Sequence, residues 1–556
     1  MTANATTERS VHPRIRSSLI RFRWPLLLAG GLLLGLTVIF PQIGLLEWIA
    51  PIPALAVLFA IATDPAVKLR RLYGLGLGFF LSFLLVTFHW FLYMYPLDFA
   101  GMSRPASAVV VTVAWIGLSL FQALGAALLF PLFGLAVRGR WLSRYPILHP
   151  VLMAALWTAL EWWWAHSGWS GVPWSRLSLG QAHLLPILQS ASILGSYFIT
   201  FLIVAVSGLL AYLILYATHR ILCVALAGGL FLGNLGFGAV RMATYEAEGT
   251  TLTVAAIQGN KSSLDYWGFE TMDEVMETYD RLTREAVAAG ADLVVWPETG
   301  VPANVDRDRY TRAYLTDLSR DCGVPILAGV FTQVSEESDA DYNSIVVALP
   351  DGTIHDTVYN KRNPVPFGEF VPFRNIVMTL IPPLAEINTL GEDIPAGVDS
   401  EVFCLPEGNI GSLICFDSIY EQNALDSVAD GAELLAVSTN DSWFRDSRGV
   451  WMHHAQSRLR AIETGRYVVR SAVTGVSSII TPTGDTVATL DPLKQGIVLG
   501  DVHLCTATTP YGIIGDVFAY LALSVSAAAV LFPPVDGMVS AIRRKKQTNK
   551  EQMKDL

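Results

Sequence analysis

The chain has few charged residues for its length. Only 15% of its 556 residues are Asp, Glu, Lys or Arg, and 52% are hydrophobic, whereas soluble proteins carry about 25% charged residues. A chain this apolar does not stay disordered, and this length argues against a single soluble domain. The composition therefore predicts a membrane protein.

Cysteine is also scarce, with five residues in the whole chain. They are scattered, and no two form a CxxC pair, which argues against a disulfide framework and a zinc site. We expect no metal and no cofactor.

Acidic residues are scarce in residues 1–245, and basic residues are outnumbered by acidic ones in residues 246–506. Residues 1–245 hold 15 Lys and Arg against 5 Asp and Glu, residues 246–506 hold 17 against 39, and residues 507–556 hold 6 against 4. The net charge of -10 is therefore the sum of +10, -22 and +2. Because the large polar segment is acidic, we expect no nucleic-acid partner.

Long charge-free stretches predict eight transmembrane helices, since about 20 apolar residues span a bilayer. The first stretch is long and is followed by no small-residue cleavage site, so it is interpreted as an anchor rather than a signal peptide. The predicted spans are centred near residues 33, 55, 83, 122, 156, 203, 230 and 522.

Every second predicted loop is rich in Lys and Arg, and these basic loops are expected on the cytoplasmic side. Both termini are then cytoplasmic, and the acidic segment lies outside the cell membrane. The predicted parts are a basic N-terminus (1–23), seven helices (24–245), an external domain (246–506), an eighth helix (507–535) and a basic tail (536–556).

The external segment alternates short apolar runs with helical spacing, which predicts an α/β domain. The expected helices cover 270–289 and 450–463. The expected strands are 252–257, 293–296, 325–330, 344–349, 357–359, 410–415 and 434–438.

Three polar residues lie at or just after the ends of predicted strands, where α/β folds place their active sites. They are Glu298, Lys361 and Cys415. Each alone has an ordinary interpretation, as a surface carboxylate, a solvated lysine or a buried structural cysteine. Together they form a chemically complete set of thiol nucleophile, carboxylate base and oxyanion-stabilising ammonium, the last assisted by the backbone N–H of Phe416. His453 and His454 are interpreted as helix-face or pocket-wall residues.

The order Glu–Lys–Cys resembles the nitrilase superfamily of carbon-nitrogen hydrolases, and with the eight-span frame the chain resembles the apolipoprotein N-acyltransferase family. The segments that carry the resemblance are Gly171–Trp174, Gln258–Asn260, Trp296–Glu298, Tyr359–Lys361, Val365–Glu369, Cys415–Asp417, Asn440–Phe444, Arg458–Arg466 and Thr509–Tyr511.

This resemblance implies a four-layer αββα domain on a bacterial inner-membrane base. It implies a phospholipid:apolipoprotein N-acyltransferase that works through a Cys415 thioester. The sn-1 acyl chain of a phospholipid would pass to the α-amine of a diacylglyceryl-cysteine apolipoprotein, which gives the mature triacylated lipoprotein. Glu298 matches the family's base, Lys361 its oxyanion partner and Glu369 a further essential glutamate. We expect a monomer.

The sequence departs from the family pattern at two places. Asp417 stands where the family usually has Glu, and the mobile-arm Trp has two candidates, Tyr266 and Trp267. Together with Trp174 and Trp443, these two aromatics are predicted to contact substrate.

Two other functions remain open from the residues alone. A membrane-anchored nitrilase-like amidohydrolase would use the same three residues with water as acceptor, and a non-catalytic membrane scaffold would use none of them. The apolar segment 376–384 is either a lid that reaches the membrane or a packed insertion.

Overall fold

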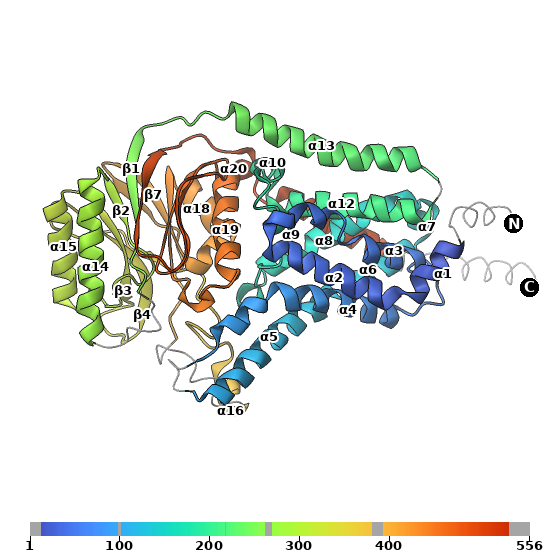
Figure 1. Cartoon of the computed structure of the whole chain (residues 1–556), viewed down its shortest axis with the longest axis horizontal. Helices are drawn as coiled ribbons and strands as arrows, with labels where there is room; N and C mark the ends of the chain where they lie inside the picture. Colours follow the sequence, from blue (N-terminus) through green and yellow to red (C-terminus); the bar gives the residue numbers. More distant parts are fainter. Residues whose placement is uncertain (1–12, 98–101, 217, 262–268, 381–392, 533–556) are drawn as a thin grey trace, which may run out of the picture.

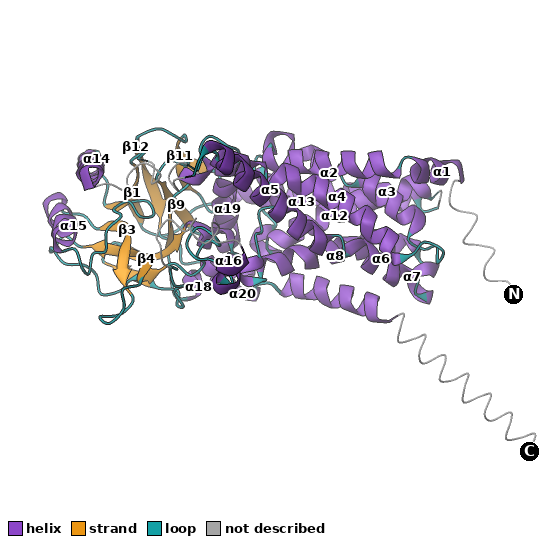
Figure 2. Cartoon of the chain, turned by 90° about the horizontal axis from the view of Figure 1, so that it is seen from below, coloured by secondary structure: helices purple, strands orange, loops and turns teal. Residues whose placement is uncertain are grey.

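The computed structural model describes residues 13–97, 102–216, 218–261, 269–380 and 393–532. All-helical and α/β parts lie end to end along the long axis of the molecule (Figure 1). Strands are confined to one end, as the view from below shows (Figure 2). Tyr266 and Trp267 fall outside the described residues, as do residues 381–384 of the predicted apolar segment.

The helical part is built from residues 13–244 and from a helix near the C-terminus, Val517–Phe532. Its longer helices are α1 (Pro13–Arg21), α2 (Arg23–Ile39), α3 (Ile52–Ile61), α4 (Leu69–Thr87), α5 (Arg104–Ala126), α6 (Leu129–Val137), α8 (His149–Ala165), α12 (Ser196–Leu215) and α13 (Arg220–Thr244). Shorter helical turns join them, including η1 (Pro41–Trp48), η2 (His89–Met94), α7 (Arg140–Arg144), α9 (Leu177–Gly180), α10 (Leu185–Leu188), α11 (Ala191–Leu194) and α20 (Pro510–Ile514).

Among the described residues, five helical stretches are long and apolar enough to cross a bilayer. They are Pro41–Ile61, Leu69–Thr87, Arg104–Val137, Ser196–Leu215 and Arg220–Thr244. The bent pair α1–α2 makes a sixth if it counts as one span. The predicted spans near 156 and 522 fall in shorter helices, so five or six of the eight predicted spans meet this criterion.

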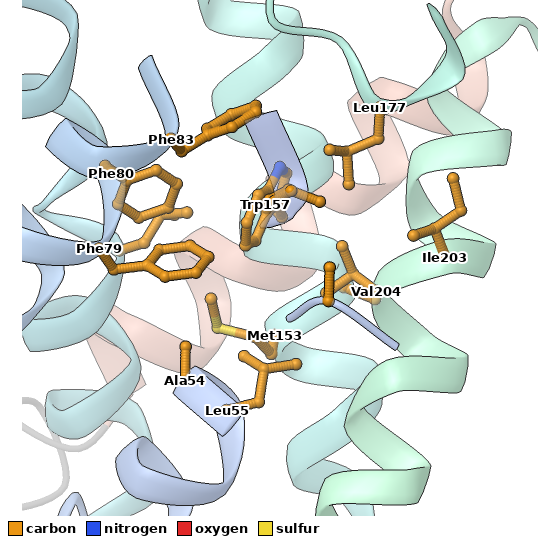
Figure 3. Packing of buried hydrophobic residues seen from close by; sticks show 14 of the residues in the cluster. Ala54, Leu55, Phe79, Phe80, Phe83, Met153, Trp157, Leu177, Ile203 and Val204 are labelled. Carbon is orange, nitrogen blue, oxygen red and sulfur yellow. The ribbon is translucent and has the colours of Figure 1, made fainter. Parts of the chain in front are cut away.

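Large aromatic side chains fill the centre of the helical part (Figure 3). The ring of Trp157 lies 5.1 Å from that of Phe80 and 6.0 Å from that of Phe79. Two glycines one helical turn apart bring α2 against α4, because a Cβ on Gly31 would lie 2.4 Å from the carbonyl oxygen of Phe79, and one on Gly35 would meet α4 at a similar distance. Small residues at this spacing let helix backbones approach closely in a bilayer.

Two six-stranded sheets form the α/β part. In the first, the order is β12 (Gly496–His503), β1 (Thr251–Gln258), β2 (Leu293–Val295), β3 (Ile326–Gln333), β4 (Asp341–Ala348) and β5 (Tyr359–Asn360). In the second, the order is β11 (Thr486–Leu490), β10 (Ser477–Ile480), β9 (Tyr467–Ala472), β8 (Leu434–Thr439), β7 (Gly408–Ile414) and β6 (Val402–Leu405). The central strands β1–β3 and β7–β9 run parallel within each sheet.

Each central strand is buried on both faces because side chains alternate between two cores. On β1, Leu252 and Val254 point between the sheets, whereas Ala255 and Ile257 point toward a helix layer. Helices α14 (Phe269–Ala288) and α15 (Arg309–Cys322) cover the first sheet, and α18 (Glu421–Ala429) and α19 (Gly449–Thr464) cover the second (Figure 1). The predicted α/β fold with two sheets between helices is confirmed.

Helix α19 lies between the second sheet and the helical part, where it contacts α2, α9 and α11 (Figure 1). A second contact between the two parts lies near α16 (Arg374–Leu380), where the ring of Phe373 meets that of Trp169 at 5.4 Å. Ile376, at the start of the predicted apolar segment, is 58% exposed. The described part of this segment is therefore a helix with an exposed apolar side chain.

Candidate active site

The ends of three strands bring Glu298, Lys361 and Cys415 together. Glu298 follows β2, Lys361 follows β5, and Cys415 follows β7. All three side chains are buried. A Cβ on Gly329 of β3 would lie 2.3 Å from the carbonyl oxygen of Pro297, so only glycine lets the turn that carries Glu298 lie against this strand.

Lys361 is held between two carboxylates. Its Nζ lies 2.7 Å from Oε1 of Glu298 and 2.8 Å from Oε2 of Glu369. Asn343 of β4 donates from Nδ2 to both carboxylates at 2.8 Å, and the backbone N–H of Asn440 donates to Glu298 at 2.8 Å. Burial acts to lower the pKa of Lys361, but the two carboxylates outweigh it and raise this pKa well above its usual value. The Lys361 side chain therefore stays protonated beside the two glutamates.

Glu369 reaches this cluster from a tight loop rather than from a strand. Its Oε2 accepts a 2.7 Å bond from the backbone N–H of Val365 in the same loop. Phe367, in the middle of the loop, has a φ of +63°. Non-glycine residues rarely adopt this conformation, and it costs about 1–3 kcal/mol. The remainder of the loop therefore has to compensate for a strained turn that aims Glu369 at Lys361.

Cys415 begins the 3-10 turn η6 (Cys415–Ile419) with a φ of +49°. The sharp turn lies against the segment that carries Lys361, because Asp417, two residues after the cysteine, accepts bonds from Tyr359 and Asn363 on either side of that lysine. Burial and the negative charge of Glu298 raise the pKa of the Cys415 thiol, and the charge of Lys361 lowers it in part. The thiol is therefore neutral at rest and needs a base before it can act as a nucleophile.

Asp417 ties the cysteine turn to the lysine loop. It accepts bonds from the hydroxyl of Tyr359 at 2.9 Å, from the backbone N–H of Ile414 at 3.1 Å and from that of Asn363 at 2.8 Å. Burial raises the pKa of Asp417 to about 6, although the charge of Lys361 acts against this rise. The aspartate at this position, where the family usually has the longer glutamate, thus still contacts the neighbouring loop.

The structure adds a histidine that sequence reasoning assigned only to a helix face or pocket wall. His453 of α19 is fully buried, and its Nε2 lies 3.2 Å from the carbonyl oxygen of Cys415. Its Nδ1 lies 2.8 Å from Oδ1 of Asp441, whose other oxygen accepts a 2.8 Å bond from Arg470. The sequence placed His453 in the predicted helix 450–463, but nothing in the sequence placed it against Cys415.

Burial and the charge of Arg470 lower the pKa of His453. Burial raises the pKa of the Asp441 carboxyl. The charge of Arg470 and the contact with His453 outweigh burial and hold this pKa well below its usual range. The pair is therefore a neutral imidazole that donates from Nδ1 to a charged carboxylate, with Arg470 as counter-ion, and its Nε2 is an acceptor that lies 3.2 Å from the hydroxyl of Ser418.

The predicted substrate-contacting aromatics differ in exposure. Trp174 is fully buried, and its ring lies 5.0 Å from Trp90, 5.1 Å from Phe444 and 6.5 Å from Phe416. Trp443 is half-buried. Trp174 therefore belongs to an aromatic cluster between the helical part and the residue that follows Cys415.

Among the described residues, one group of three has metal-ligand geometry: His166, Glu421 and Asp516. The Glu421 carboxylate already pairs with Arg176 at 2.6 Å and accepts a hydrogen bond from Tyr197. Glu421 is therefore engaged in an ion pair with Arg176, and Asp516 lies 3.5 Å from His166.

Comparisons with known proteins agree with both halves of the molecule. A family model for the apolipoprotein N-acyltransferase N-terminal domain matches residues 30–209, and one for carbon-nitrogen hydrolase matches residues 253–509. The apolipoprotein N-acyltransferase of Gloeobacter violaceus is 31% identical over 93% of this chain and 94% of its own length. Those of Geobacter metallireducens (32%, over 68% of this chain and 72% of its own) and Methylococcus capsulatus (30%, over 88% and 92%) are also similar. The chain therefore belongs to the apolipoprotein N-acyltransferase family.

Proposed function

We propose that this protein transfers an acyl chain from a phospholipid to the N-terminal amine of a diacylglyceryl-cysteine apolipoprotein, through a thioester on Cys415. The observation that carries the proposal is the buried Glu298–Lys361–Glu369 cluster beside the Cys415 thiol. It stands in a domain joined to an apolar helical base. Both substrates are anchored in a membrane. An enzyme that acts on them therefore needs a helical membrane part, whereas a soluble amidohydrolase does not.

In the first step, Glu298 takes the thiol proton of Cys415, and the sulfur attacks the carbonyl carbon of the sn-1 ester. The Lys361 ammonium and the backbone N–H of Phe416 stabilise the negative charge on the carbonyl oxygen. The ester C–O bond then breaks, and the proton on Glu298 passes to the departing glycerol oxygen. The products are a lysophospholipid and the acyl thioester.

In the second step, the free amine of the apolipoprotein attacks the thioester carbonyl. Glu298 takes a proton from the nitrogen as the amide bond forms. The C–S bond breaks, and the proton on Glu298 passes to the departing sulfur, which regenerates the Cys415 thiol. Glu369 pairs with Lys361 at 2.8 Å and holds it in place through both half-reactions.

We propose that the helices of the base make eight spans of a bacterial inner membrane, with both termini in the cytoplasm and the α/β domain on the outer face. Cys404 is exposed on this domain, whereas Cys223 is buried in α13. A membrane-impermeant maleimide added outside intact spheroplasts should therefore label Cys404. Labelling of Cys404 only after lysis would contradict this orientation, and a Cys404→Ala variant controls for other thiols.

Intact-mass analysis with phospholipid and a diacylated lipopeptide tests the reaction itself. Wild type should gain one acyl mass without acceptor and produce acylated lipopeptide with it. Cys415→Ala should do neither, and Cys404→Ala should behave as wild type. Release of free fatty acid alone would indicate a hydrolase, and absence of both products would indicate a scaffold.

A further inference from the structure

The helical base and the catalytic domain are joined at the loop between α8 and α9. Two backbone carbonyls of this loop accept bonds from the catalytic domain. The hydroxyl of Tyr420 donates to Gly171 at 2.8 Å, and Nε2 of Gln456 donates to Pro173 at 3.3 Å. The loop therefore contacts both the segment that follows Cys415 and helix α19.

Arg176, at the end of this loop, makes a fully buried ion pair with Glu421. Its Nη2 lies 2.6 Å from Oε2 of Glu421, and each side chain is 1% exposed. Arg176 also contacts Ser196 and Tyr197 at the start of α12, both at 3.3 Å, and Tyr197 donates to Glu421. The ion pair thus crosses from the helical base to the catalytic domain.

Glu421 is the first residue of α18, and one residue separates it from the turn that begins with Cys415. Arg460 of α19 lies 3.8 Å from Glu421 and donates at 3.4 Å to the carbonyl oxygen of Ser418 within that turn. Arg460 also pairs with Glu463 at 2.5 Å. The network pairs two arginines with two glutamates, and one side of it is attached to the nucleophile turn.

A buried ion pair adds little net stability, because desolvation of both charges offsets their attraction. It is nevertheless directional, since a charge-assisted hydrogen bond weakens when its partners shift. A pair of this kind at a junction therefore specifies relative position more than it strengthens the fold. The relevant position here is that of the Cys415 turn over the membrane base.

We propose that Arg176 and Glu421 are positioning residues that hold the Cys415 turn in register with the membrane base, so that the ester of a bilayer lipid reaches the thiol. This inference rests on the proposed acyltransferase function. Loss of the pair should impair acylation from a lipid held in a bilayer and spare acylation from a small soluble donor. A soluble donor reaches Cys415 from water and does not need the helical membrane part to position it.

The test compares two donors on the full-length protein in liposomes of phosphatidylethanolamine. One donor is the bilayer phospholipid, followed as the acyl mass on Cys415. The other is p-nitrophenyl butyrate, followed as the burst of nitrophenolate. Arg176→Ala should lower kcat/KM for phospholipid roughly 10- to 100-fold, as expected for a misplaced reacting group, with the nitrophenolate burst near wild type. Arg176→Lys should restore part of the loss.

Arg284→Ala is the matched control, because it removes an arginine paired with Asp280 and Asp321 on the exposed face of α14. It should leave both donors unchanged. Equal losses for both donors in Arg176→Ala, or no loss for either, would overturn the inference. If wild type itself takes acyl groups only from the soluble ester, the proposed function fails instead.

A second variant covers the case in which Arg176→Ala does not fold. Arg176→Met combined with Glu421→Leu removes both charges and leaves neither unpaired. This double variant should fold and still show the loss specific to phospholipid. Wild-type turnover of phospholipid by the double variant would overturn the positioning role.

Discussion

The Nε2 atom of His453 lies 3.2 Å from the carbonyl oxygen of Cys415, 38 positions earlier in the chain. The same oxygen accepts a 2.7 Å bond from the hydroxyl of Ser418. Cys415 has a φ of +49°, and a strained backbone persists only where its surroundings hold it. The buried imidazole packs against this turn and faces the Ser418 hydroxyl with Nε2 at 3.2 Å, so the histidine is part of what keeps the turn in shape.

Replacing His453 should slow thioester formation without abolishing it. His453→Ala removes the contact with the Cys415 carbonyl, and a small shift of the thiol should lower the acylation rate roughly 10- to 100-fold. Single-turnover acylation with phospholipid measures this rate. His454→Ala is the matched control, because His454 is equally buried but contacts Ser478 at 2.9 Å. An equal rate loss in both variants would contradict a specific role for His453.

Removing the Glu298 charge should make the thiol more reactive toward a small alkylating reagent while acyl transfer fails. Glu298 raises the pKa of Cys415, so Glu298→Gln should lower that pKa and increase the thiolate fraction at neutral pH. Mass spectrometry of iodoacetamide adducts across pH 6–10 measures the shift. Acyl transfer should fall about 100-fold or more because the base is lost. An alkylation profile unchanged from wild type would contradict the coupling of the two groups.

Loss of Lys361 should damage both stability and chemistry. Lys361→Met leaves Glu298 and Glu369 side by side without a cation, and breaking a buried pair costs about 3–5 kcal/mol. Loss of an oxyanion donor should lower the acylation rate about 100- to 1000-fold. Lys494→Met is the control, because this lysine is 59% exposed and pairs with Asp491 at the surface. Thermal unfolding and single-turnover acylation report the two effects.

Asp417 should make the stability of the α/β domain depend on pH. Its pKa is about 6 in the folded protein against 3.8 for the unconstrained group, so the folded state holds the proton more tightly. Its contribution is fully present below pH 4 and falls by about 3 kcal/mol as the pH rises to about 6 and above.

Thermal unfolding of wild type and Asp417→Asn between pH 4 and pH 7.5 measures this dependence. The asparagine variant should lack the decline, since its side chain does not titrate. Asp446→Asn, at an exposed position, should retain the wild-type pH dependence. A parallel pH dependence in wild type and Asp417→Asn would contradict the raised pKa.

Local sequence patterns predicted seven of the twelve described strands, because a strand buried on both faces must be apolar throughout, and they missed β6 and β9–β12. The runs at 252–257, 293–296 and 410–415 correspond to β1, β2 and β7. Helix 450–463 corresponds to α19, which covers Gly449–Thr464. The spans were harder to predict, since a charge-free stretch predicts burial or membrane contact but not the length of the helix inside it.

The sequence by itself determined the class of molecule, the strand-end positions of Glu298, Lys361 and Cys415, and the family. Hydropathy, charge and strand-end placement are local properties, so they can be recognised before the chain folds. Only the tertiary structure decided that Arg176 pairs with Glu421 and that His453 reaches the carbonyl of Cys415. Both contacts join residues far apart in sequence, and packing alone determines which buried polar groups meet.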